Sequence, residues 1–86
     1  MKASALPMAL GSVERVTFYK RDELTTDLIC CELMSCGQLW TLHEELPGWD
    51  AAIAELGKLP GFRYDWYAHV SPPPFDAHPF VAFEAG

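Results

Sequence analysis

Hydrophobic and polar residues alternate along the first half of the chain, in the pattern typical of β-strands. In residues 13–20 (VERVTFYK), Val16 and Phe18 alternate with more polar neighbours, as expected of a half-buried strand. Residues 27–34 (DLICCELM) predict a second strand, and the polar run RDELTT at residues 21–26 predicts the turn between the two.

A tight hairpin is expected next, because Cys36 and Gly37 can form a two-residue loop in which Gly37 supplies a positive φ angle. This loop places Leu33 opposite Trp40. Alternation then puts one uncharged set of side chains on a single face: Ile29, Cys31, Leu33, Trp40 and Leu42. The opposite face is mixed and holds Cys30, Glu32, Met34, Leu39, Thr41 and His43. We therefore expect the uncharged face to lie against the core.

The hydrophobic spacing changes to 3.6 residues after Pro47, which predicts a short helix of about ten residues. Its apolar stripe consists of Trp49, Ala52, Ile53 and Leu56. Pro47 suits a first helical turn, and Gly57 suits the residue just after a helix. A helix this short is not stable alone in water, so it must lie on the sheet.

The segment at residues 62–70 (FRYDWYAHV) has two interpretations. Its alternating aromatic residues favour a strand, and a short helix over residues 65–70 is the alternative. Residues 71–79 (SPPPFDAHP) predict an extended loop, because consecutive prolines impose polyproline geometry. Residues 80–84 (FVAFE) predict a closing strand at a sheet edge.

These elements predict an α+β fold. We expect a two-layer domain with an antiparallel sheet of about four strands, in the order β-β-β-α-β, and one helix packed on one face over Leu33 and Trp40. Residues 1–12 are expected to form a flexible N-terminal tail, and residues 13–86 a single domain. The apolar run in that tail is short and interrupted by Pro7, so a secretory signal is not expected.

The net charge of the chain narrows the classes of binding partner that we expect. The chain has 86 residues, with 12 acidic and 6 basic side chains and a net charge of −6. No basic cluster larger than Lys20 and Arg21 occurs, so we expect neither nucleic-acid binding nor attraction to anionic membranes. No apolar run approaches the roughly 20 residues that a membrane-spanning helix needs. An odd number of cysteines, two of them adjacent, is unlike a secreted disulfide scaffold and favours a cytoplasmic location.

The three cysteines, Cys30, Cys31 and Cys36, have two interpretations. A metal site needs converging pairs of ligands, whereas adjacent strand residues point to opposite faces, so we expect no metal and no other cofactor. The favoured interpretation is that Cys31 is a small core residue and the other two are incidental thiols. The alternative pairs Cys30 with His43 on the mixed face, near Glu32, as a thiol and imidazole site or as half of a site completed by a second copy.

Aromatic residues concentrate between Phe62 and Phe80, beside several prolines. In a domain of this size, most of them are expected in the core. The alternative is an exposed aromatic patch used for self-association or for binding a partner. Its candidate binding residues are Tyr67, His69 and Phe75.

Three stretches of the sequence, LTTDLICCEL, LHEELPGWDAAIAELGKLPGF and VSPPPF, resemble a set of small bacterial proteins of unknown function. The resemblance covers residues 13–83 and implies a compact α+β domain, with no catalytic residues to transfer.

Three functional hypotheses follow from these observations. The first is a non-enzymatic interaction or accessory domain, as a homodimer or bound to a protein partner. The second is a small thiol- or metal-dependent activity that uses Cys30 and His43. The third, supported by net charge alone, is an acidic inhibitor of a cationic site.

Overall fold

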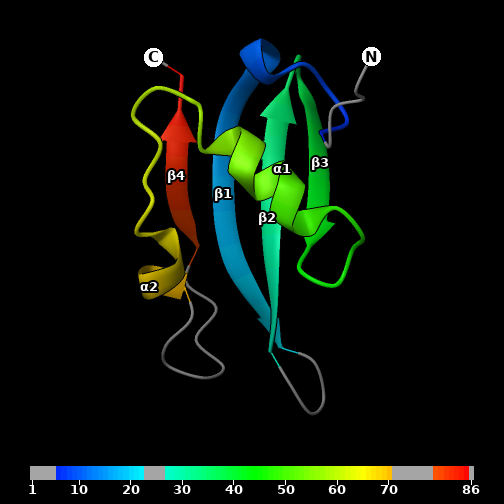
Figure 1. Cartoon of the computed structure of the whole chain (residues 1–86), viewed down its shortest axis with the longest axis vertical. Helices are drawn as coiled ribbons and strands as arrows, with labels where there is room; N and C mark the ends of the chain where they lie inside the picture. The colour runs from blue at the N-terminus through cyan, green and yellow to red at the C-terminus, as the bar shows by residue number, and fades with distance from the viewer. Residues whose placement is uncertain (1–5, 23–26, 71–78, 86) are drawn as a thin grey trace.

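The computed structural model describes residues 6–22, 27–70 and 79–85. A short 3₁₀ turn (Leu10–Ser12) precedes the strands β1 (Val13–Asp22), β2 (Asp27–Ser35) and β3 (Gln38–His43); then come the helices α1 (Trp49–Leu56) and α2 (Trp66–Val70) and the strand β4 (Phe80–Glu84). The strands form one antiparallel sheet in the order β3-β2-β1-β4 (Figure 1). The predicted α+β class, with a four-stranded antiparallel sheet and a helix, is confirmed.

The helix α1 crosses in front of β1 and β2 in Figure 1. Gly48 precedes it with a φ angle of 88°, a left-handed conformation that glycine adopts without steric cost, and its carbonyl accepts the first helical hydrogen bond from Ala52 N at 2.9 Å. The buried cluster of the domain joins Ala52 and Leu56 to Val16, Phe18 and Leu33 of the strands. Burial of this apolar stripe compensates for the low intrinsic stability of an eight-residue helix.

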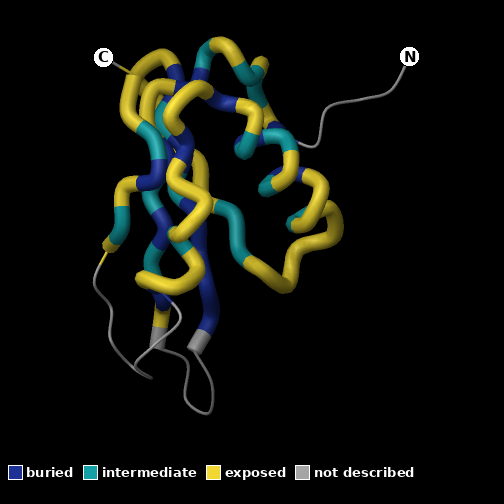
Figure 2. The backbone as a smooth tube through the Cα atoms, turned by 60° about the vertical axis from the view of Figure 1, so that its left-hand side comes forward, coloured by how far each residue is buried: buried dark blue, intermediate teal, exposed yellow. Residues whose placement is uncertain are grey.

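The register of the hairpin between β2 and β3 is as predicted, with Leu33 opposite Trp40 and Cys36 and Gly37 in the loop. Leu33 is fully buried, but the expectation that Trp40 shares this burial is wrong, since 36% of its surface is exposed. The reason is the position of β3 at the edge of the sheet, where Trp40 lies outside the buried cluster that α1 forms with β1 and β2. Figure 2 shows buried positions along the central strands and exposed ones along residues 44–48.

The strand interpretation of residues 62–70 is wrong, and the helix alternative is correct for residues 66–70. Phe62 and Trp66 both pack on Phe18, with ring centroids 6.3 and 3.9 Å from it. The first contact is made from a turn and the second from α2, so these aromatic residues reach one core residue without forming a strand. The domain therefore has a second helix, which lies against β4.

The ends of the domain agree in part with the prediction. β4 is the closing strand and lies at an edge of the sheet, as expected. Flexibility of residues 1–12 stays a prediction; within the described part of that segment, Leu6 is buried, and Met8 and Leu10 pack against the core. The predicted loop at residues 71–79 lies almost wholly outside the described residues.

Candidate functional site

Among the residues that the structure describes, the outer side of β3 is the strand edge most open to pairing. Its hairpin turn requires positive φ angles at both loop residues, and Cys36 and Gly37 have φ angles of 52° and 76°. Glu44 N donates to Ile29 O at 3.0 Å, which continues the ladder beyond His43. Because hydrogen-bonded pairs alternate in an antiparallel ladder, the even-numbered residues of β3 bond to β2. The backbone groups of Leu39 and Thr41 and the N–H of His43 therefore point away from the sheet.

The side chains around this edge are apolar and exposed. Leu39 and Trp40 of β3 expose 57% and 36% of their surface, and Leu46 in the following loop exposes 36%. From Gln38 to His43 the strand has no Asp, Glu, Lys or Arg, although the chain carries a net charge of −6. Edge strands of monomeric proteins are usually protected by charges, prolines or bulges. β3 has none of these charges and no proline.

The opposite edge of the sheet is covered at one point. Arg63 N donates to Ala82 O on β4 at 2.8 Å, which occupies a backbone acceptor on the side away from β1. The Arg63 guanidinium also lies over the Phe80 ring, 5.1 Å from its centroid. The segment before α2 thus occupies a backbone acceptor in the middle of β4. On β3 the comparable bond, from Leu46 N to His43 O, lies at the last residue of the strand and leaves the outward groups of Leu39 and Thr41 to an added strand.

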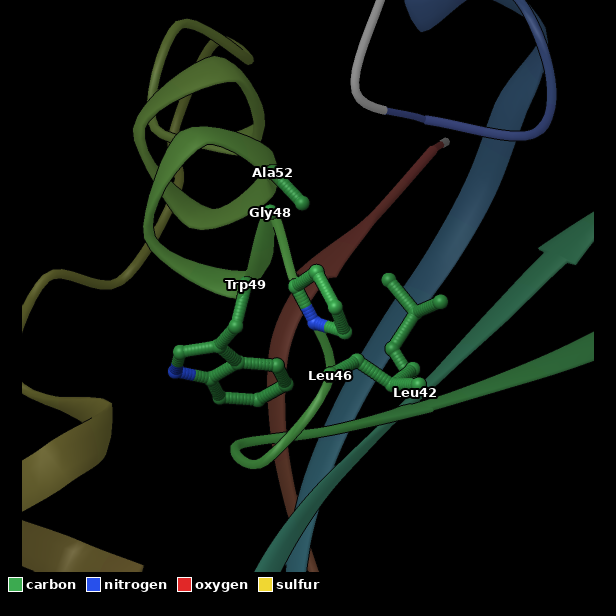
Figure 3. A pocket seen from close by; sticks show the side chains of 6 residues that line it. Leu42, Leu46, Gly48, Trp49 and Ala52 are labelled. Atoms are coloured by element: carbon green, nitrogen blue, oxygen red, sulfur yellow. The ribbon is translucent and has the colours of Figure 1, made fainter.

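An apolar cleft lies beside β3 on the side of the sheet that faces α1. Figure 3 shows Leu42, Leu46 and Trp49 around it, between the end of the strand and the start of the helix. The lining also includes Pro47, Gly48 and Ala52. Its volume of about 30 Å³ suits a single small group and not a whole ligand.

The other face of the sheet holds a wider depression of about 160 Å³. It is lined by Arg15, Thr17, Glu32, Met34 and Leu39. One cation and one carboxylate stand among apolar groups here, and the lining offers no set of convergent donors.

The structure brings Cys30 and His43 together as direct partners in the register between β2 and β3. Tyr19 is the partner of Cys30 on the other side, so three ionisable side chains form a row across the sheet. Cys30 is fully buried, and its Sγ lies 3.7 Å from Leu28 O. The Nδ1 atom of His43 is buried and has no hydrogen-bond partner in the described chain. No group of three or more metal-ligating side chains occurs among residues 6–22, 27–70 and 79–85.

The thiols should differ sharply in reactivity. Cys36 is exposed at the hairpin turn, whereas Cys30 and Cys31 are buried. Burial, followed by the neighbouring Cys30 and Glu32, raises the pKa of the Cys31 thiol to about 12, which suppresses the reactive thiolate. With a disulfide reagent such as DTNB, we expect one thiol to react at once in the native protein and two only on unfolding. Cys36→Ser should abolish the fast phase; a fast phase that survives this substitution would show that a β2 thiol is accessible.

The structure describes two of the three predicted aromatic binding residues. Tyr67, 56% exposed, lies on α2 and meets the Trp66 ring edge-on at 5.6 Å. His69 stacks on Phe80 at 4.5 Å, and its Nε2 lies 3.1 Å from a carboxylate oxygen of Asp65. These contacts fix α2 against β4. The third residue, Phe75, lies outside the described residues.

Asp65 also bonds to Arg63, at 2.7 Å. This hydrogen bond is the main cause that lowers the pKa of the Asp65 carboxyl, and the bond to His69 acts in the same direction. Asp65 therefore ties two neighbours of the Phe80 ring together. These surface contacts hold α2 in place against β4.

Comparison with known proteins finds no matching family model, no matching curated protein and no matching solved structure. The resemblance to small bacterial proteins therefore stays a prediction. Among the described residues, no helix is long and apolar enough to cross a membrane.

Proposed function

We propose that this protein is a non-enzymatic interaction domain that forms a homodimer by pairing the β3 edge of one copy with that of another. The observation that carries the proposal is the contrast between the two sheet edges. β4 is bonded to the Arg63 segment, whereas β3 presents outward backbone groups flanked by exposed Leu39 and Trp40. Strand addition to an open edge gains backbone hydrogen bonds, and side chains on both faces add specificity.

Self-association also suits the size of the domain. An 86-residue chain has a small core, and small domains are often stabilised by oligomerisation. Two antiparallel β3 strands related by a twofold axis would extend the four-stranded sheet across both copies. The exposed apolar side chains of β3 would lose contact with water in the same step.

Thiol- or metal-dependent activity at Cys30 and His43 is the second candidate, favoured by their direct pairing across the strands. The full burial of Cys30 weakens it, because a reactive thiol must be reached by its substrate. Fast labelling of Cys30 in the experiment above would support this candidate.

The proposal is tested with Thr41→Pro. The Thr41 N–H points away from β2, so proline removes a donor needed only for an added strand and is tolerated at an edge. By size exclusion with light scattering, we expect a dimer for the native chain and a monomer for Thr41→Pro, with unchanged circular dichroism. Thr41→Val keeps the N–H and should remain dimeric. A native chain that stays monomeric at high concentration would refute the proposal.

A further inference from the structure

The ladder of β3 and the cleft beside it restrict how two copies can meet. We infer that two β3 strands pair antiparallel about Thr41, so that Trp40 of each copy covers the cleft formed by Leu42, Leu46 and Trp49 of the other. This inference rests on the proposed homodimer and specifies its register and its anchoring side chain.

The outward backbone groups favour a register centred on Thr41. In that register Thr41 lies opposite Thr41 of the other copy, and Leu39 lies opposite His43. This gives about four backbone hydrogen bonds, and about six when each His43 carbonyl also accepts from Leu39 N of the other copy. A register centred on Trp40 pairs Leu39 with Thr41 and gives about four between the two β3 strands. The carbonyl of His43 already accepts from Leu46 N at 3.0 Å, so the inter-copy bonds to this oxygen are shared with the loop and are weaker than the others.

The side chains favour the same register. With Thr41 at the axis, Trp40 lies opposite Leu42 of the other copy, in a pair without backbone hydrogen bonds, where side chains approach most closely. Leu42 is one wall of the cleft in Figure 3, and Trp40 is on the same face of the sheet. At about 30 Å³ the cleft is too small to admit an indole, so the ring would cover its opening. A register centred on Trp40 would place the two indoles against each other and leave both clefts open.

The lack of charge on β3 allows a second copy of this acidic chain as the occupant. Two chains of net charge −6 repel each other except where their contact surfaces carry no charge, and residues 38–43 are such a surface. The adjacent Glu44 is held toward β2, because its Oε1 accepts from Ile29 N at 3.0 Å. Neither β3 nor the adjacent Glu44 therefore places a carboxylate against the other copy.

Disulfide trapping tests the register. In a Cys36→Ser background, Thr41→Cys places two thiols at Cα positions about 5.5 Å apart in the inferred register, within reach of a disulfide. In the register centred on Trp40 they would be diagonal neighbours, about 7–8 Å apart and beyond that reach. We expect a covalent dimer with Thr41→Cys and none with Leu39→Cys, whose two copies would be roughly 13 Å apart along the strands.

Affinity measurements test the anchor. Buried tryptophans at the centre of an interface contribute strongly, so Trp40→Ala should raise the dimer dissociation constant at least about tenfold. Leu46→Ala, in the loop that lines the cleft, should weaken the dimer in the same direction, and it does not alter β3. Val81→Ala, an exposed apolar side chain on the opposite edge strand β4, is the matched control and should leave the constant unchanged.

The outcomes separate the two proposals. A dimer that Thr41→Pro dissociates, but that neither forms the Thr41→Cys disulfide nor responds to Trp40→Ala and Leu46→Ala, would overturn the register and keep the proposed function. A monomeric native chain would overturn both.

Discussion

Phe18→Ala is expected to lower the free energy of unfolding by about 3–5 kcal/mol, the usual cost of deleting a buried phenylalanine ring. Phe18 is fully buried on β1 and is the centre of an aromatic cluster. Its ring stacks on Trp66 at 3.9 Å and meets Trp49 and Phe62 edge-on at 6.4 and 6.3 Å. Both helices and the turn at Phe62 lose a shared contact, so neighbouring groups have little freedom to close the cavity.

The measurement is urea unfolding followed by circular dichroism, with the thermal midpoint as a second readout. For a domain of this size each kcal/mol corresponds to roughly 4–8 °C, so the midpoint should fall by at least about 12 °C. Tyr67→Ala removes an exposed aromatic ring and should cost less than about 1 kcal/mol. Equal losses in the two variants would show that Phe18 is not the centre of the core.

Leu56→Ala is expected to cost about 2–5 kcal/mol, because Leu56 is fully buried in the cluster that joins α1 to the sheet. Alanine has the higher helix propensity, so the substitution strengthens the isolated helix while it removes the contact. Any loss of stability therefore reports packing of α1 on the strands.

Ala51→Gly is the matched control for Leu56→Ala, since Ala51 is an exposed position of the same helix. Glycine should lower stability by about 1 kcal/mol through helix propensity alone. Urea unfolding of both variants compares packing with propensity directly. If Leu56→Ala costs no more than Ala51→Gly, α1 is not held by its buried face.

The hairpin between β2 and β3 could be predicted in detail because its determinants are local. Cys36 and Gly37 define the loop, and the loop together with the alternation fixes every pair up to Cys30 and His43. The pairing of those two residues at the candidate thiol site followed from the same rule. The burial of Cys30 on the mixed face could not be predicted from this rule, because it depends on neighbours from other strands.

The order of strands in the sheet could not be obtained from periodicity. Nothing in the residues of β3 distinguishes an edge strand from a central one, so Trp40 was expected in the core. The same limit applies to Phe62 and Trp66, whose spacing suggests a strand although each reaches Phe18 from a different local structure. The open edge of β3, the basis of the proposed function, emerges only from the assembled sheet.

The pairing of β1 with β4 has a consequence for synthesis on the ribosome. The ion pair between Arg15 and Glu84 joins residues 69 positions apart, whereas the β2–β3 hairpin closes within a few residues. Closing so long a loop is entropically costly, so we expect docking of the last strand to be the slow step of folding. Until β4 docks, β1 of a nascent chain is a second strand with an unpaired edge. On a crowded polysome, mispairing between chains would begin at this edge.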